Sequence, residues 1–354
     1  MLDLFANTYK GKKVVVTGDT GFKGSWLCIW LKELGADVYG YALPPLTEKD
    51  NYVVTALASK IKHTDGDIRD KDKLQHFFHS IQPDIAFHLA AQPLVIESYN
   101  NPHYNFETNV MGTVNFFEAV RNCNSVKVAI NITTDKCYQN NEWVWGYREN
   151  DAMGGDDPYS ASKGCSELIT NSYLKSFFGK GNTHIASARA GNVIGGGDWA
   201  ANRILPDSIK AYQTKQELTI RNPEAVRPWQ FVLEPLYGYL KLAQMLLTQG
   251  KQFSGGWNFG PSAYENYSVS DVVNEIKKVI PSLNVNLSDN NNKPHEAGLL
   301  KLDITKAVNV LGWKPKLNFE QTIHFTIQGY LDELSETSNC YHSRVIQINN
   351  YCAL

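Results

Sequence analysis

Tyr159 and Lys163 have the residue types and the spacing of an acid–base pair on one helix. Residues 156–158 (Asp-Asp-Pro) are typical of a helix start, and apolar residues then recur at helical spacing as far as Phe177. Residues four apart share a helix face, so we expect the ammonium to lower the pKa of the phenol from about 10 towards neutrality. The phenolate could then take a proton from a substrate hydroxyl while hydride leaves the same carbon. Such pairs also occur by chance, so this one needs a cofactor site beside it.

A glycine turn over residues 18–24 is the second chemical signal. It follows a β-branched strand pattern at 12–17 and precedes an amphipathic helix pattern that ends at Gly35, as in the first half of a dinucleotide-binding unit. The first glycine permits the tight turn, the second lets a pyrophosphate approach, and the third allows close packing of helix on strand. The helix start then offers free N–H groups to phosphate. The predicted dinucleotide contacts in this turn are Gly18, Thr20, Gly21, Phe22 and Gly24.

Strand patterns alternate with helix patterns over the first 190 residues. This alternation predicts an α/β fold: a Rossmann-type, doubly wound parallel sheet with a smaller α/β substrate-binding lobe. We expect residues 1–190 to form the dinucleotide-binding domain and residues 191–334 the lobe, with about 229–255 as candidates for returning to the sheet. Residues 335–354 show no clear period and are interpreted as a partly ordered C-terminal extension.

Several residues at strand ends are candidates for holding the cofactor, because ligands of such sheets lie at the carboxyl ends of the strands. Asp67 and Ile68 follow the third strand and could meet an adenine, although Asp67 could instead cap the helix predicted at 70–81. The second strand ends without the usual acid for the adenosine ribose and without an arginine for a 2′-phosphate. His88 is interpreted as a core histidine. The small-residue turn after it adds the candidates Leu89, Ala90 and Ala91.

Composition excludes several classes of function. A net charge of −2 without a basic stripe argues against nucleic-acid binding. The six cysteines form no C-x-x-C pair and are typical of reduced thiols in a cytosol. No apolar run reaches membrane-spanning length, so we expect a cytoplasmic protein without a membrane partner. His295-Glu296 has no third ligand at metal spacing, so no metal site is predicted.

The motifs T-G-D-T-G-F-K-G, H-L-A-A-Q, T-T-D, Y-S-A-S-K and R-A-G-N-V-I-G occur in this order along the chain. Together they resemble the extended short-chain dehydrogenase/reductase family, and within it the nucleotide-sugar 4,6-dehydratases, as far as about Leu334. The resemblance implies NAD as cofactor. It also implies that Thr134, Tyr159 and Lys163 form the hydride-transfer triad, and that Asp135 protonates the departing C6 oxygen.

Lys136 departs from part of this family. The dTDP-glucose dehydratases have a glutamate here as the base, whereas T-D-K-C-Y and G-F-K-G resemble the branch that acts on CDP-glucose. As the base at C5, Lys136 would have to be neutral, and as the acid Asp135 would have to be protonated. We expect their side chains to point to different sides of the sugar, or to share one proton.

The reaction implied by the resemblance oxidises C4, eliminates water across C5 and C6, and returns hydride to C6. It would feed the synthesis of deoxysugars for lipopolysaccharide O-antigen. Alternatives are a dehydratase or 4-epimerase acting on dTDP-glucose, GDP-mannose or a UDP-sugar, and a non-catalytic nucleotide-sugar sensor on the same fold.

Candidates for binding the substrate follow the last strand of the first domain. Asn192 falls on the family's substrate-loop asparagine, and Arg227, or as second choice Arg203, could bind the diphosphate bidentately. Either arginine could instead form a surface ion pair. Trp199 and Trp229 could stack on a pyrimidine, although buried aromatic residues are commoner than stacking platforms.

Two predicted helices, residues 103–122 and 158–178, carry more apolar residues than one buried face requires. The family commonly pairs these helices across a two-fold axis into a four-helix bundle. We therefore expect a homodimer, or a dimer of dimers.

Overall fold

Seven parallel strands form the central sheet, in the order β11-β6-β5-β4-β1-β2-β3. The structure is a computed structural model that describes the chain apart from residues 1, 201–202, 221, 263, 288–298 and 336–338. The inner strands are buried along nearly their whole length without alternation, as expected where helices cover both faces. The strands are β1 (Lys13–Thr17), β2 (Asp37–Ala42), β3 (Lys62–Asp65), β4 (Ile85–His88), β5 (Val128–Thr133), β6 (His184–Ala190) and β11 (Gly255–Phe259).

The strand order reverses between β1 and β4, because β2 and β3 lie on one side of β1 and β5, β6 and β11 lie on the other side of β4. The carboxyl ends of β1 and β4 therefore mark the switch point where ligands of doubly wound sheets bind. The predicted Rossmann-type α/β fold is confirmed.

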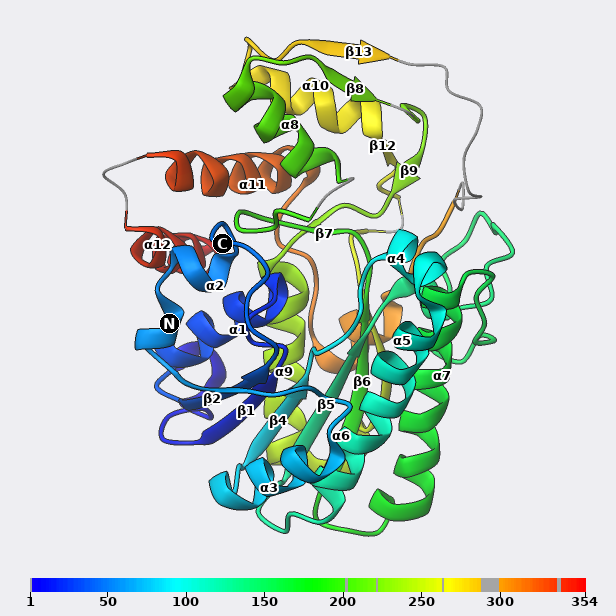
Figure 1. Cartoon of the computed structure of the whole chain (residues 1–354). Helices are drawn as coiled ribbons and strands as arrows, with labels where there is room; N and C mark the ends of the chain where they lie inside the picture. The colour runs from blue at the N-terminus through cyan, green and yellow to red at the C-terminus, as the bar shows by residue number, and fades with distance from the viewer. Residues whose placement is uncertain (1, 201–202, 221, 263, 288–298, 336–338) are drawn as a thin grey trace.

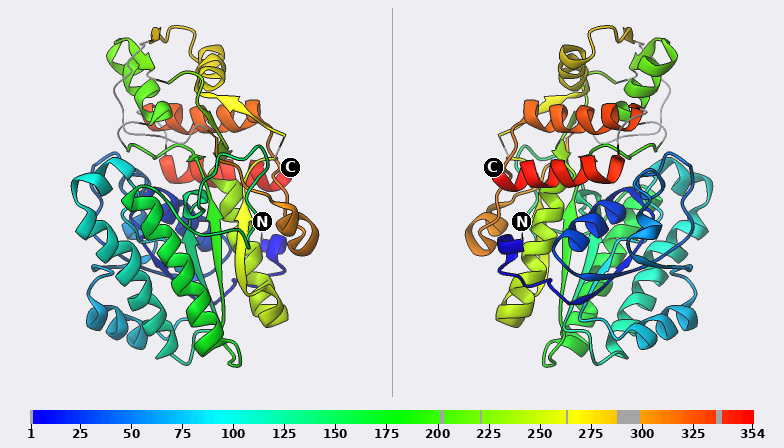
Figure 2. Two further views of the ribbon diagram at one scale, coloured as in Figure 1. Left: turned by 90° about the vertical axis from the view of Figure 1, so that its right-hand side faces the viewer. Right: turned by 90° about the vertical axis from the view of Figure 1, so that its left-hand side faces the viewer.

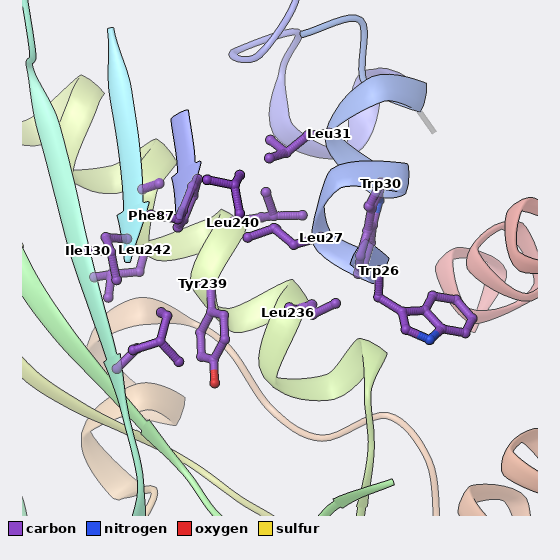
Figure 3. Close-up of a cluster of buried hydrophobic side chains, with 14 of the residues drawn as sticks. Trp26, Leu27, Trp30, Leu31, Phe87, Ile130, Leu236, Tyr239, Leu240 and Leu242 are labelled. Atoms are coloured by element: carbon purple, nitrogen blue, oxygen red, sulfur yellow. The ribbon is translucent and has the colours of Figure 1, made fainter. Parts of the chain in front are cut away.

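Helices cover both faces of the sheet (Figure 1). Val14 and Val16 of β1 belong to a core cluster with α1, α9 and α12, whereas Val15 belongs to a second cluster under α3 and α6. Figure 3 shows how Trp26 and Trp30 of α1 lie beside apolar side chains of α9 in the first cluster. These helices are α1 (Phe22–Glu33), α3 (Lys71–Ile81), α6 (Gly112–Arg121), α7 (Pro158–Tyr173), α9 (Leu233–Gln249) and α12 (Cys340–Ala353).

A smaller lobe lies at one end of the sheet and has an apolar cluster of its own (Figure 1). The lobe contains two short strand pairs, β8 with β13 and β9 with β12. A third pair, β7 with β10, lies where the lobe meets the sheet. Its elements are α8 (Ile204–Thr214), α10 (Val269–Val279), α11 (Phe319–Leu334), β7 (Val193–Ile194), β8 (Leu218–Ile220), β9 (Val226–Arg227), β10 (Gln230–Phe231), β12 (Tyr267–Ser268) and β13 (Val285–Leu287).

The chain crosses between sheet and lobe more than once. After the first lobe segments, α9 packs under the sheet and β11 becomes its edge strand next to β6. The C-terminal residues, expected as a partly ordered extension, instead form α12, which packs against α1 and α11 (Figure 2). The apolar period of α12 is weak because its one buried face includes polar residues, with Arg344 and Gln347 beside Ile348 and Tyr351.

The two helices predicted at 103–122 and 158–178 are present, each with a π-helical turn. The first is a run of α5 (Pro102–Phe106), η3 (Glu107–Met111) and α6, and the second is α7 followed by η5 (Leu174–Phe178). The remaining short elements are α2 (Asn51–Val54), α4 (Val95–Asn100), η1 (Leu2–Phe5), η2 (Leu57–Ser59), η4 (Asp135–Cys137), η6 (Gly250–Phe253) and η7 (Ala307–Leu311).

Candidate active site

The start of α7 places Tyr159 and Lys163 against the carboxyl end of β5. Asp157 caps the helix by accepting a hydrogen bond from the Ser160 N–H at 2.9 Å, and Pro158 occupies the first turn. Tyr159 and Lys163 are 8% and 6% exposed, and the Lys163 ammonium donates to the Ile132 carbonyl at 3.4 Å. Both side chains therefore lie inside the molecule at the strand end, where the spacing placed them on one face.

Thr134 and Asp135 meet the pair from the end of β5. The Thr134 hydroxyl donates to Asp135 Oδ1 at 2.9 Å, and it lies close enough to the Tyr159 hydroxyl to influence its pKa. Asp135 is only 1% exposed, and a Cβ at Gly191 would lie 1.8 Å from its Oδ2. The glycine is needed there because any side chain would displace the carboxylate. Thr134, Asp135, Tyr159 and Lys163 thus form one cluster.

Lys136 follows in the 3-10 turn η4, and its backbone N–H donates to Thr134 Oγ1 at 3.4 Å. Its side chain is half-buried. Within the part of the chain that the structure describes, Asp135 and Lys136 form no ion pair with each other. This arrangement is compatible with side chains that point to different sides of a substrate.

Burial decides the pKa of Tyr159, and in the direction opposite to the one expected from the sequence. The loss of hydration raises the pKa of the phenol above its ordinary value, while the nearby Thr134 hydroxyl and the charge of Arg203 act to lower it. Burial also lowers the pKa of Lys163 to about 8, against the charge of Glu167. The prediction that Lys163 brings the phenol near neutrality is therefore wrong for the chain by itself.

Lys23 is a cation of this site to which the sequence interpretation gave no role. It lies in the first turn of α1, is half-buried, and has charge interactions with Lys163, Arg203 and Asp135. Burial, and then the two positive neighbours, lower the pKa of Lys23 to about 8. Its place in G-F-K-G, where the helix faces phosphate, is the signal that could have identified it.

The glycine turn leaves no room for side chains at the switch point. A Cβ at Gly18, where φ is +78°, would lie 2.6 Å from the Ala90 nitrogen, and one at Gly24 would lie 2.0 Å from the Gly18 oxygen. None of the described side chains caps the start of α1 at Gly21. The first N–H groups of α1 are thus available to an anion. The glycine turn 18–24 and the start of α1 therefore form a cradle that fits a dinucleotide pyrophosphate.

Two other residues of the turn are tied to neighbouring segments. The Thr20 hydroxyl donates to the Leu43 carbonyl at 2.8 Å and so links the turn to the end of β2. The Phe22 ring lies against Gly195, because a Cβ there would be 3.2 Å from Phe22 Cζ. The predicted dinucleotide contacts therefore also shape the path of the chain around the site.

The turn Leu89–Ala91 lies directly across from Gly18, and its residues are half-buried. Asn109, which the sequence interpretation left without a role, anchors this turn by accepting from the Gln92 N–H at 2.9 Å and donating to Ser162 of α7 at 2.9 Å. His88 is a core histidine, as predicted: it is buried, bonded to Thr17 at 2.8 Å, and its pKa is lowered to about 3 by burial.

Asp67 does not cap the following helix, so that alternative is wrong. The cap of α3 is Asp70, whose side chain accepts from the Lys73 N–H at 3.0 Å. Asp67 instead pairs with Arg69 at 2.7 Å. Ile68 is buried against Gly112 in the core cluster under α6. Contacts of Asp67 and Ile68 with an adenine remain predictions.

Three of the candidates for substrate binding, Asn192, Trp199 and Arg203, come from the segment that follows β6. Asn192 has a positive φ of 45° and holds β10 through its carbonyl, which accepts from the Gln230 N–H at 3.2 Å. Arg203 pairs with the buried Asp198 at 2.5 Å and lies close enough to influence Tyr159. Trp199 is half-buried and donates its indole N–H to Glu333 at 2.9 Å.

Arg227 lies apart from this group, on β9, and lines a small pocket with Pro228, Glu265 and Lys301. The indole N–H of Trp229 donates to the Tyr267 carbonyl at 3.0 Å, and stacking on a pyrimidine stays a prediction for both tryptophans. His295 and Glu296 lie outside the described residues.

Sequence comparison places this site in a known group of enzymes. The family model described as GDP-mannose 4,6 dehydratase matches residues 15–326. The chain belongs to this family. The match spans the glycine turn, the β5 end and the whole of α7, so the clustered residues are part of the family's common fold.

Relatives of the dehydratase family include the CDP-glucose 4,6-dehydratase of Salmonella typhimurium, which is 49% identical over 322 residues, 90% of each chain. The dTDP-glucose 4,6-dehydratase 1 of Escherichia coli is 25% identical over 361 residues, covering 92% of this chain and 95% of its own. The resemblance to nucleotide-sugar dehydratases predicted from the motifs is confirmed.

Solved structures with the dehydratase family's fold include UDP-glucose 4-epimerase from Stenotrophomonas maltophila with bound NAD. It has a TM-score of 0.78, 19% identity, and covers 92% of this chain and 100% of its own. UDP-glucuronic acid 4-epimerase from Bacillus cereus has a TM-score of 0.77 at 23% identity, covering 91% and 100%. Among the described residues, no helix is long and apolar enough to span a bilayer.

Proposed function

We propose that the chain is a CDP-glucose 4,6-dehydratase that uses NAD. The observation that carries the proposal is the buried cluster of Thr134, Asp135 and Tyr159 beside the glycine cradle at the switch point. A 4-epimerase needs the threonine and the tyrosine but no acid at C6, so Asp135 favours a dehydratase. The relative that is 49% identical supports CDP-glucose as the substrate.

NAD is supported by the fit of the cradle, where glycines at 18 and 24 leave only backbone at the turn. When bound, NAD would supply reversible hydride chemistry, as the acceptor of the C4 hydride and, in its reduced form, as the hydride donor for C6. Gly18, Gly21 and the start of α1 would hold its pyrophosphate, and Lys163 would hold its nicotinamide ribose. Because the net change in redox state is zero, the cofactor would be regenerated in each turnover.

Tyr159 would accept the proton of the C4 hydroxyl, and Thr134 would orient that hydroxyl through its own hydrogen bond. Burial disfavours the phenolate, so positive charges must hold it. Lys163 and Arg203 would do this, and the charge of Arg203 acts to lower the pKa of the phenol. Water is excluded from Tyr159, which strengthens each of these interactions.

The elimination step would use the two residues after Thr134. Asp135 would give its proton to the departing C6 oxygen, so that water leaves, and Lys136 would remove the proton from C5. The C5–C6 double bond forms from the electron pair of the broken C5–H bond. The separation of the two side chains into different environments, one buried and one half-buried, supports this division of roles.

The proposed function is tested by incubating the chain and NAD with CDP-, dTDP-, UDP- and GDP-sugars. With CDP-glucose we expect a proton NMR signal for a C6 methyl group beside a C4 ketone, without accumulation of reduced cofactor. Conversion of CDP-glucose to its C4 epimer would favour the epimerase alternative. Binding without turnover of any of these sugars would favour the sensor.

Replacing Lys136 is expected to slow the exchange of the C5 proton with solvent. In deuterated water, the wild-type product should carry deuterium at C5, and the rate of its appearance should fall by at least about 10²-fold in Lys136→Met. Lys136→Glu should recover part of this rate, because a carboxylate can also act as a base. Equal rates of C5 exchange in all three proteins would remove Lys136 from the role of base.

The alkaline side of the pH profile should report the two lysines with lowered pKa. Both Lys163 and Lys23 have a pKa lowered to about 8, so they lose their charge as the pH rises through that value. We therefore expect kcat/KM for CDP-glucose to fall above pH about 8. Lys23→Arg, which keeps its charge, should weaken this fall, whereas Lys175→Arg at an exposed position should not. A profile that stays flat to pH 10 would contradict the assignment.

We also propose a cytoplasmic homodimer formed through α5–α6 and α7. Exposed apolar side chains on these helices, Phe106 and Met111 on one and Leu168 and Phe177 on the other, support this surface. The mass by light scattering should equal two chains, or four for a dimer of dimers, and Leu168→Lys should lower it. The mass of one chain for the wild type would contradict the proposal.

A further inference from the structure

Arg344 of the C-terminal helix α12 is completely buried. In the sequence it is far from Thr134, Asp135, Tyr159 and Lys163, which form the catalytic cluster. Its Nε donates to Asn51 Oδ1 at 3.0 Å and its Nη1 donates to the Gly329 carbonyl at 3.0 Å. Its Nη2 forms an ion pair with Glu333, and the guanidinium lies over the Trp26 ring at 5.0 Å. One side chain thus connects α2, α11 and α1.

The partners of Arg344 hold the loop between β7 and α8. Glu333 also accepts the indole N–H of Trp199 at 2.9 Å, and Trp26 donates its own indole N–H to the Gly196 carbonyl at 3.0 Å. A Cβ at Gly196 would lie 2.8 Å from Arg344 Nη1. The loop therefore contacts the Arg344 guanidinium and also its two partners Trp26 and Glu333.

The same loop carries Asp198, whose carboxylate holds Arg203 near the catalytic cluster. Asp198 is held by the Tyr330 hydroxyl, which donates to its carbonyl at 2.5 Å, and its carboxylate binds Arg203 at 2.5 Å. Arg203 in turn lies near Tyr159 and Lys23. A continuous set of contacts therefore runs from α12 through residues 196–199 to Arg203.

A buried guanidinium with this many fixed partners is costly to place and has essentially one geometry. Helix α12 can place the Arg344 guanidinium in this position because it lies alongside α11 and next to α1, where lobe and sheet meet (Figures 1 and 2). A displacement of the guanidinium would move Gly196 and release Glu333. The position of Asp198, and with it Arg203, would then no longer be fixed.

We propose that Arg344 is a positioning residue for substrate binding: the C-terminal helix completes the site by fixing the loop 195–199, which places Arg203 against the diphosphate of the nucleotide sugar. This inference rests on the proposed function, since it assigns Arg203 to a nucleoside-diphosphate sugar. It makes α12 a part of the substrate site even though no residue of α12 touches the substrate.

The test compares Arg344→Met with the wild type in kinetics and in calorimetric binding of CDP and of NAD. We expect the KM for CDP-glucose and the Kd for CDP to rise at least about tenfold, as for one misplaced charge-assisted contact. The value of kcat should fall by less than the KM rises, since Arg203 also acts to lower the pKa of Tyr159, and the Kd for NAD should not change. Arg344→Lys should recover little, because an ammonium cannot reach three partners at once. Asn349→Ala, at an exposed position of α12, is the control.

Two further variants distinguish the proposed positioning role of Arg344 from a contribution to stability alone. Arg344→Met with Glu333→Gln removes both buried charges and protects the fold if Arg344→Met alone unfolds. In an Arg203→Ala background, Arg344→Met should raise the KM by less than about twofold, because the loss is already present. Full additivity of the two changes, or losses of CDP and NAD binding in parallel with the folded fraction, would overturn the inference. If the wild type turns over a different nucleotide sugar, CDP-glucose and CDP are replaced by that sugar and its nucleoside diphosphate, and the same comparisons apply.

Discussion

Replacing Tyr159 by phenylalanine is expected to lower kcat for CDP-glucose by about 10³-fold, within the range of about 10² to 10⁴ typical of acid–base residues. The phenol is 8% exposed and lies beside Thr134, so burial hinders solvent from replacing it as the proton acceptor. Without a base for the C4 hydroxyl, hydride cannot leave C4, and the later elimination cannot begin. Single-turnover absorbance of the reduced cofactor would measure the first step directly.

Tyr173→Phe is the matched control for this variant. Tyr173 lies on the same helix, and its hydroxyl also makes one hydrogen bond, to Glu118 at 2.9 Å, but outside the cluster. We expect its kcat to be within about twofold of the wild type. Binding of NAD to Tyr159→Phe should be preserved, since glycines provide the cradle. A Tyr159→Phe enzyme with full activity would refute the proposed chemistry.

Replacing Glu167 by glutamine is expected to cost about 3 kcal/mol or more of the free energy of unfolding, because it leaves Arg189 charged and buried without its partner. Glu167 lies one helical turn after Lys163, and the two side chains of the ion pair are 3% and 5% exposed at a distance of 2.7 Å. Ser187 also donates to Glu167, at 2.6 Å, and Thr133 donates to its other oxygen. Urea unfolding followed by tryptophan fluorescence would measure the loss.

Two comparisons make this prediction specific. Glu275→Gln removes a solvent-exposed ion pair on α10 and should cost less than about 1 kcal/mol. Glu167→Gln combined with Arg189→Met should be more stable than Glu167→Gln alone, since no charge is then left unpaired. An equal loss for Glu167→Gln and Glu275→Gln would show that the buried pair contributes nothing beyond an exposed one.

The same pair gives a stability effect with a defined dependence on pH. Burial raises the pKa of Glu167, but the charge of Arg189 and the hydrogen bonds outweigh it, so the pKa lies below its ordinary value. A carboxyl with a lowered pKa contributes stability above its unfolded pKa of about 4.3. The difference between wild type and Glu167→Gln should therefore be complete at neutral pH and shrink as the pH falls below about 4.

Features of this protein that depend on near neighbours in the chain could be predicted from the sequence alone. The helix start at Asp157 and Pro158, the glycine turn after β1 and the alternation of strands with helices all follow from local spacing. Because parallel strands expose their carboxyl ends on one edge, this local information was sufficient to bring Thr134 to Tyr159. The motifs also led to the correct family.

The degree of burial at the site and the contacts between distant segments depend instead on the packing of the folded chain. The direction of the pKa shift of Tyr159 is set by burial, which no spacing of residues encodes. Lys23 approaches Lys163 only because the first turns of α1 and α7 meet at the same edge of the sheet. Arg344 had no recognisable signal, since its partners at 51, 329 and 333 come from separate segments. Contacts of this kind depend on the packing of the whole chain, and periodicity within one helix cannot predict them.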